Sequence, residues 1–196
     1  ILNWCFGGPP KSFYAVGGRQ CRDYSKQAKQ AAKALNDGDE SKWKEYEGNI
    51  WDHIGTELEY PNGARCLSMG RHAPKSSNRV SEHIVGTKGV SDCRNRLTDH
   101  DGKELWKFKG KNHNGRTEEH AVMIRALRGK GERVNEGKRI AESTLTAIGG
   151  RMSAYTGRHF SWEWLLQKSK LSLVPEKVES GKGLFRPVPT GHDELV

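Results

Sequence analysis

The chain has 196 residues, enough for one domain with a hydrophobic core or for one domain with an appendage. Hydrophobic residues make up 34% of it and charged residues 29%, which is typical of a soluble protein with much exposed surface and argues against disorder. The net charge of +9 suggests an anionic partner such as nucleic acid, but 24 acidic residues are interspersed among the 33 basic ones, so the excess need not form a patch.

The first part of the chain predicts two helices and a strand. "ILNWCFGG" has the pattern of a helix end closed by glycines, and because the chain opens there without a methionine we expect a fragment or a processed product. "KSFYAVGG" predicts a short strand. Residues 24–47 are interpreted as an inserted basic helical arm, with Ser25 as the helix cap and three lysines on its outer face: Lys26, Lys29 and Lys33.

Residues 50–111 contain the signals of several strands joined by hairpins, including alternation of Thr56, Leu58 and Tyr60 with Glu57 and Glu59. "IWDHIGTELEY" and "ARCLSMGRH" flank a turn at residues 61–63, and "NRVSEHIVGTKGVSDC" predicts a third strand that ends at residues 86–89 and is followed by the start of another strand. Asp101-Gly102 forms the turn of a second hairpin. Strands connected in this way predict a largely antiparallel sheet.

Helical periodicity follows the strands. Residues 116–131 predict a helix with Thr117 as its N-cap and with one stripe made of His120, Met123, Ile124 and Leu127. A longer helix ends at Gly157, and a short helix capped by Ser161 comes after it. Residues 175–196 are rich in proline and glycine and predict an extended tail.

The longer helix contains "RIAESTLTAIGGRMSAYTG", residues 139–157, in which small residues surround the adjacent Gly149 and Gly150. The three charged residues in this stretch exclude a membrane span, which needs an apolar run of about 20 residues. Two glycines in a helix interior cost about 1 kcal/mol each relative to alanine, so we expect close packing or a kink at this point. A helix lying flat on a sheet would account for them.

Strands followed by helices predict an α+β fold, a largely antiparallel open sheet with helices packed on one face. We expect residues 1–174 to form this domain. The four cysteines (Cys5, Cys21, Cys66 and Cys93) are far apart and include no C-x-x-C pair, so neither a zinc site nor a disulfide framework is expected.

Few residues carry a chemical signal. The sequence contains no G-x-G-x-x-G, no P-loop, no G-x-S-x-G and no H-E-x-x-H. His120 in the first helical turn would be held neutral by the helix dipole. Asp52 could orient His53, although neighbouring strand residues point to opposite faces, which weakens the pair. Aromatic and basic residues alternate over residues 105–111, as in a nucleic-acid-binding strand, but any half-buried strand with lysines on its outer face has the same pattern.

Several motifs taken together resemble the C-terminal domain of the Gfo/Idh/MocA oxidoreductases. In chain order they are "NWCFGG", "VGGRQ", "DHIGTELEYPNGARCLSMGR", "NRVSEHIVGTKG", "EEHAVMIRALRGK" and "VNEGKRIAESTLTAIGGRMSAYTGRHFSW". The resemblance covers residues 1–164 and is closest to a bacterial subgroup frequent in planctomycetes. Residues 24–47 depart from the family pattern, which has a much shorter link there.

The resemblance implies a substrate-binding and oligomerisation domain of an NAD(P)-dependent oxidoreductase that acts on a sugar or cyclitol hydroxyl. It also implies that the Rossmann domain, with the catalytic lysine, and the acid/base histidine lie upstream of Ile1, so that no catalytic, cofactor-binding or metal-binding residue is expected in this chain. The implied partners are that missing domain, a sugar-like molecule and further copies of the chain bound through the open sheet. NAD or NADP is the cofactor implied for the full-length enzyme.

On the same resemblance, three residues are expected nearest the substrate: His120, His53 and Arg71. Arg71 could hold a carboxylate or hydroxyl, and His120 could donate to a sugar oxygen. Two alternatives stay open: a stand-alone carbohydrate-binding or assembly module, and a basic nucleic-acid-binding protein. Nucleic acid is the less expected partner, no membrane association is expected, and cytoplasm and periplasm both remain possible.

Overall fold

The computed structural model describes residues 1–21, 23–46 and 50–170. The described residues within 1–76 and 136–170 form one compact unit, here called the sheet unit, and residues 77–135 form a second, the insert unit. That residues 1–174 work as a single domain stays a prediction. The tail predicted at residues 175–196 lies outside the described residues.

The sheet unit is built on four antiparallel strands in the order β3-β2-β1-β8. These strands are β1 (Ser12–Gly18), β2 (His53–Glu59), β3 (Arg65–Arg71) and β8 (Phe160–Ser161). The helices of this unit are α1 (Leu2–Cys5), α2 (Ser25–Leu35), α3 (Trp43–Tyr46), α5 (Gly137–Thr156) and α6 (Trp162–Gln167).

The insert unit contains a second antiparallel sheet and one helix. The sheet order is β4-β5-β6-β7, with β4 (Ile84–Gly86), β5 (Gly89–Ser91), β6 (Arg96–Thr98) and β7 (Glu104–Lys107), and the helix is α4 (Gly115–Leu127). The α+β class with antiparallel sheets is therefore confirmed. The predicted third strand ends at Gly86 and another strand begins at Gly89, as expected, but the third strand starts later than predicted, because pairing begins only at Ile84.

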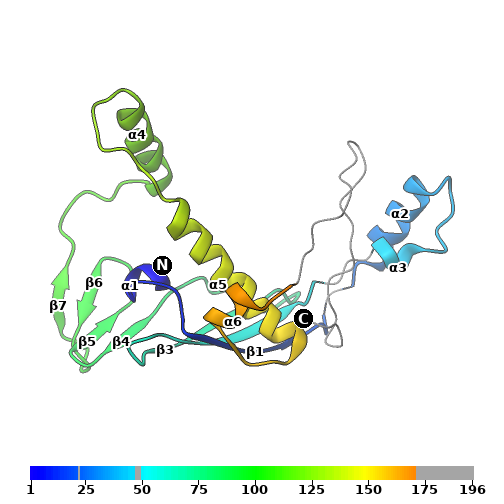
Figure 1. Ribbon diagram of the computed structural model, residues 1–196, viewed down its shortest axis with the longest axis horizontal. Coiled ribbons are helices and arrows are strands. Elements are labelled where there is room, and N and C mark those ends of the chain that lie inside the picture. The colour runs from blue at the N-terminus through cyan, green and yellow to red at the C-terminus, as the bar shows by residue number, and fades with distance from the viewer. Residues whose placement is uncertain (22, 47–49, 171–196) are drawn as a thin grey trace. The chain divides into compact units, whose positions relative to one another are not determined.

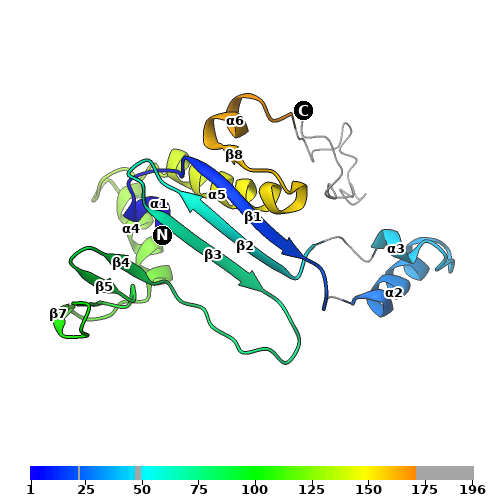
Figure 2. The same cartoon turned by 90° about the horizontal axis from the view of Figure 1, so that it is seen from below.

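Helix α5 covers one face of the main sheet and leaves the other face open, as Figures 1 and 2 show. Along β1, Phe13 and Ala15 are buried beneath this helix, whereas Tyr14 and Val16 are exposed on the other side. The buried cluster joins the sheet to α5 and α6 through six residues: Phe13, Leu58, Tyr60, Met152, Phe160 and Leu165. Helices thus pack on one face of this sheet, as predicted.

The adjacent glycines of α5 lie where the helix touches the strands. A Cβ atom added to Gly149 would lie 2.6 Å from the Phe13 ring, and one added to Gly150 would lie 2.9 Å from Thr56 Oγ1. Both distances are shorter than the 3.5–4.0 Å of an ordinary carbon contact. Close packing therefore accounts for the glycine pair, and the helix ends at Gly157, whose φ of 64° is left-handed.

Two predicted helix caps are wrong. The side chain of Asn114 accepts a hydrogen bond from Arg116 N at the start of α4, so this helix begins earlier than the expected cap at Thr117. Ser25 is the first helical residue of α2, and Asp23 Oδ1 accepts from its backbone N. Ser161, by contrast, caps α6 as predicted, by accepting from Trp164 N.

Within the insert unit no residue is fully buried. The stripe of α4 remains exposed, with Met123 at 49% and Leu127 at 79% of full exposure. Short strands and a helix that bury no side chain give little hydrophobic stabilisation, so this unit gains little stability from its own packing. Among the described residues no helix has the length and apolar content that crossing a bilayer requires.

Candidate functional site

The open face of the main sheet presents four rows of side chains that run across β1, β2 and β3. Strand register places Tyr14, Glu57 and Leu67 in one row, and Val16, Gly55 and Met69 in the next. The four apolar side chains of these two rows are 55–68% exposed: Tyr14, Val16, Leu67 and Met69. The centre of the open face is therefore largely apolar.

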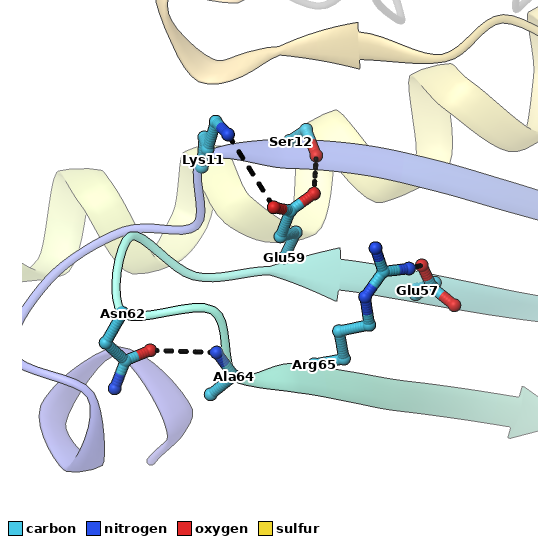
Figure 3. A network of polar contacts seen from close by, with 7 residues as sticks. All are labelled: Lys11, Ser12, Glu57, Glu59, Asn62, Ala64 and Arg65. Carbon is cyan, nitrogen blue, oxygen red and sulfur yellow. Dashed lines mark hydrogen bonds and ion pairs between the residues drawn. The ribbon is translucent and has the colours of Figure 1, made fainter.

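A polar row borders this apolar centre at one end (Figure 3). Glu59 accepts a hydrogen bond from Ser12 at 3.5 Å, and its carboxylate lies 3.6 Å from Lys11 Nζ. Next to it, Arg65 Nη1 donates to Glu57 Oε1 at 2.6 Å. Both ion pairs lie at the surface, with side chains between 31% and 66% exposed, so they contribute little to stability.

The opposite end of the open face contains two of the predicted site residues. Antiparallel register pairs His53 with Gly18 of β1 on one side and with Arg71 of β3 on the other. His53 and Arg71 are therefore neighbours on one face, as their assignment to one site requires. The side chain of His53 is 38% exposed, and Arg71 is exposed as well.

Asp52 immediately precedes β2 at this end of the sheet and is only 3% exposed. Its Oδ1 lies 2.7 Å from His53 Nδ1, while its Oδ2 accepts from Gln20 N at 2.6 Å and from Cys21 N at 2.5 Å. The sequence indicates that Asp52 could orient His53, but adjacent strand positions were expected to weaken the pair. That objection does not apply, because β2 begins at His53 and Asp52 is outside the strand.

The backbone of Asp52 is fixed as firmly as its side chain. Its N donates to Gly18 O at 3.0 Å, and its carbonyl accepts from His72 N at 2.7 Å. Next to it, Trp51 stacks on Tyr155 of α5 with ring centroids 4.3 Å apart, and the hydroxyl of Tyr155 accepts from Trp51 N. The end of the sheet that carries His53 is therefore held to the covering helix.

His120 lies in the insert unit, whereas His53 and Arg71 lie in the sheet unit, so its membership of one site with them stays a prediction. It sits in the second turn of α4, not the first, and its Nδ1 is 2.6 Å from the carbonyl oxygen of Arg116. His120 therefore lies beyond the first turn of the helix, which is where the helix dipole acts most strongly.

The other sequence signals give no further site. Trp106 and Phe108, with ring centroids 6.5 Å apart, line a shallow pocket over residues 104–110, all within one stretch of chain. All four cysteines are free thiols. Among the described residues no group of three or more His, Cys, Asp or Glu side chains is placed to hold a metal ion.

Two side chains near α1 have raised pKa values. Burial raises the pKa of Tyr60 to about 12, and the phenol donates to Asn3 Oδ1 at 2.9 Å. Burial also raises the pKa of the Cys66 thiol, which keeps it protonated and unreactive at neutral pH. Neither group lies on the open face, since Phe6 covers Tyr60 with ring centroids 4.4 Å apart and both pack on the core.

Solved oxidoreductases have a similar fold. The WlbA dehydrogenase from Bordetella pertussis, solved in complex with NADH and UDP-GlcNAcA, matches with a TM-score of 0.51 and 19% identity over 82% of this chain and 40% of that one. The aldose-aldose oxidoreductase from Caulobacter crescentus, complexed with glycerol, matches with a TM-score of 0.51 and 16% identity over 82% of this chain and 43% of that one.

These similarities confirm the expected fold, but they do not identify a substrate, a cofactor or a subgroup. The chain spans less than half the length of either oxidoreductase. No protein-family model matches the sequence, and a search of curated proteins finds no match.

Proposed function

We propose that this chain is the substrate-binding and oligomerisation part of an NAD(P)-dependent oxidoreductase of the Gfo/Idh/MocA type, acting on a sugar or cyclitol hydroxyl. The observation that carries the proposal is the fold: most of the chain matches a minor part of two oxidoreductases, one of which was solved with a nucleotide sugar and NADH. The closer assignment to a planctomycete-type subgroup rests on the sequence motifs alone.

The dinucleotide itself does not fit the described residues. Rossmann sites use parallel strands and a glycine-rich turn that opens a helix. Every described strand pair here is antiparallel, and the sequence has no G-x-G-x-x-G. On this proposal NAD or NADP binds to a separate Rossmann domain, which also supplies the catalytic lysine and histidine, and the present chain contributes no step of the hydride transfer.

The substrate would bind at the end of the open face where His53 and Arg71 are neighbours. Arg71 presents a guanidinium suited to a carboxylate or a hydroxyl oxygen, and His53 presents a partly exposed imidazole ring. These two groups can orient a polar, hydroxyl-rich ligand at a fixed distance from one another. His120 remains a predicted third contact that the insert unit would supply.

Oligomerisation would use the apolar centre of the same face. Tyr14, Val16, Leu67 and Met69 form an exposed patch that is bordered at both ends by polar rows, which is the common arrangement of a protein–protein interface. A symmetric pair of such faces buries each patch against its copy. The polar row with His53 and Arg71 would then lie at the rim, where a ligand can reach it.

A stand-alone assembly module is the second candidate. The observation in its favour is the insert unit, in which no residue is fully buried and Trp106, Met123 and Leu127 are exposed. A unit of this kind is typical of a segment that packs on a partner. An assembly module would form oligomers but would bind no sugar.

Two matched arginine variants test the proposal. Arg71→Gln removes the charge beside His53, and Arg65→Gln makes the same change on the same strand and face at the opposite end. Carbohydrate binding by the chain, measured by titration calorimetry with sugars, cyclitols and uronates, should weaken about tenfold in Arg71→Gln, the effect of losing one charge-assisted hydrogen bond.

Arg65→Gln should bind the same ligand as tightly as the unmodified chain does. Equal losses in both variants would show that binding is not localised to the His53 end. An unmodified chain that binds no carbohydrate but still oligomerises would favour the assembly module.

A further inference from the structure

The pairing of Asp52 with His53 has a consequence for the imidazole ring. The two oxygens of the carboxylate have different partners: Oδ2 accepts two backbone N–H groups, from Gln20 and Cys21, and Oδ1 faces His53 Nδ1 at 2.7 Å. An ionised carboxylate can only accept hydrogen bonds. Nδ1 must therefore carry the hydrogen in this contact, and in the neutral ring the lone pair is left on Nε2.

The position of Nε2 is defined by the neighbouring strand. A Cβ atom added to Gly18 would lie 3.2 Å from His53 Cε1 and 3.4 Å from Nε2, so the ring edge leans over this glycine on the open face. Gly18 leaves room for the ring and adds no side chain that could cover Nε2. The ring is thus held at its Nδ1 edge by a buried carboxylate, while its opposite edge lies on a partly exposed surface.

We propose that Asp52 is a positioning residue that fixes His53 as the Nδ1–H tautomer, so that Nε2 accepts the hydrogen of a substrate hydroxyl. The inference rests on the proposed function, since it specifies how that site recognises a sugar or cyclitol: by accepting from a hydroxyl rather than by donating to an oxygen. Asp52 would not touch the ligand itself.

Asp52→Asn separates positioning from a purely structural role. In the asparagine variant the carboxamide oxygen has to take the place of Oδ2, because only an acceptor can satisfy the N–H groups of Gln20 and Cys21. The NH₂ group then faces His53 Nδ1 and donates to it. Nδ1 becomes the acceptor and Nε2 carries the hydrogen, so the tautomer inverts although the shape of the site is retained.

Nitrogen-15 NMR of the whole chain, recorded at a pH where the ring is neutral, measures the tautomer directly. His53 is assigned by the signal lost in His53→Gln, since the chain has 8 histidines. The unmodified chain should show an unprotonated Nε2, and Asp52→Asn should show a protonated one. An Nε2–H tautomer in the unmodified chain would overturn the proposal even if the variant failed to fold.

Glu118→Gln is the matched control. His113 Nδ1 lies 3.1 Å from Glu118 Oε1 in an exposed pair, so this variant changes a histidine–carboxylate contact without touching Asp52. It should leave the His53 signal unchanged. An unchanged His53 tautomer in a folded Asp52→Asn variant would assign Asp52 a structural role only.

A binding measurement separates this inference from the proposed function. The sugar or cyclitol that binds the unmodified chain should bind Asp52→Asn about tenfold more weakly, because its hydroxyl then meets a donor instead of an acceptor. If no such ligand binds while the tautomers behave as stated, the proposed function fails and the positioning role stands. If the ligand binds both forms equally although the tautomer inverts, His53 Nε2 is not the acceptor.

Discussion

Replacing Gly149 by alanine tests the packing that holds α5 on the sheet. The added Cβ would lie 2.6 Å from Cε1 and Cζ of Phe13, about 1 Å closer than an ordinary carbon contact. The Phe13 ring is fully buried and has Phe160 and Trp162 beside it, with ring centroids at 5.5 and 6.1 Å. The ring therefore has little room to move away, and the helix or the strand must shift.

The expected loss of stability is about 2 kcal/mol. Overpacking a tight core destabilises a protein by up to about 3 kcal/mol, whereas replacing glycine by alanine in a helix interior stabilises it by about 1 kcal/mol. With a typical urea dependence, this loss lowers the unfolding midpoint by about 1 M, a shift that circular dichroism resolves. Phe13→Leu in the same background should reduce the loss, because the smaller side chain vacates the contact.

Gly70→Ala is the control for this experiment, since no atom lies within 4 Å of the added Cβ and its φ is not left-handed. It should not destabilise the protein, and it should raise stability slightly by restricting the unfolded chain. A Gly149→Ala variant as stable as the unmodified protein would refute the account of the glycine pair as a close-packing device.

Two further predictions concern the open face and the core. Met69→Asp places a charge in the apolar centre of the open face, at a side chain that is already 68% exposed, so it should dissociate an oligomer into folded monomers. Light scattering measures this as a fall in molar mass. An unchanged molar mass would place the interface elsewhere. Tyr60 has a folded-state pKa of about 12 against about 10 in the unfolded chain, so its contribution to stability is complete below pH 10 and is lost as the pH rises toward 12. Between these pH values, the free energy of unfolding measured by denaturant melts should fall by up to about 1.4 kcal/mol per pH unit because of this group. Tyr60→Phe should remove this part of the pH dependence. An equal pH dependence of the unfolding free energy in both proteins would contradict the assignment.

Much of the main sheet could be predicted from the sequence because its turns and small residues are unambiguous. The turn at residues 61–63 sets Tyr60 opposite Ala64, and counting back along both strands pairs His53 with Arg71. The pattern "AIGG" within a helix predicted close contact with a sheet, and Phe13 and Thr56 supply that contact.

Other features depended on contacts that local patterns do not encode. The start of β2 decides whether Asp52 can reach His53, and strand boundaries are poorly determined by alternation alone. The stripe with Met123 and Leu127 predicted a packed helix, yet α4 buries no residue within its unit. An amphipathic pattern indicates that a face can be buried, and it does not identify the surface that covers it.

The most direct test of the proposed function follows the imidazole signal of His53 while the chain is titrated first with sugars, cyclitols and uronates and then with NADH and NADPH. The account predicts that at least one of the hydroxyl-rich ligands shifts this signal, that Arg71→Gln weakens the effect, and that neither dinucleotide binds. Tight binding of NADH by this chain, or a His53 signal that no carbohydrate perturbs, would contradict the assignment of the chain as the substrate-binding part of an oxidoreductase.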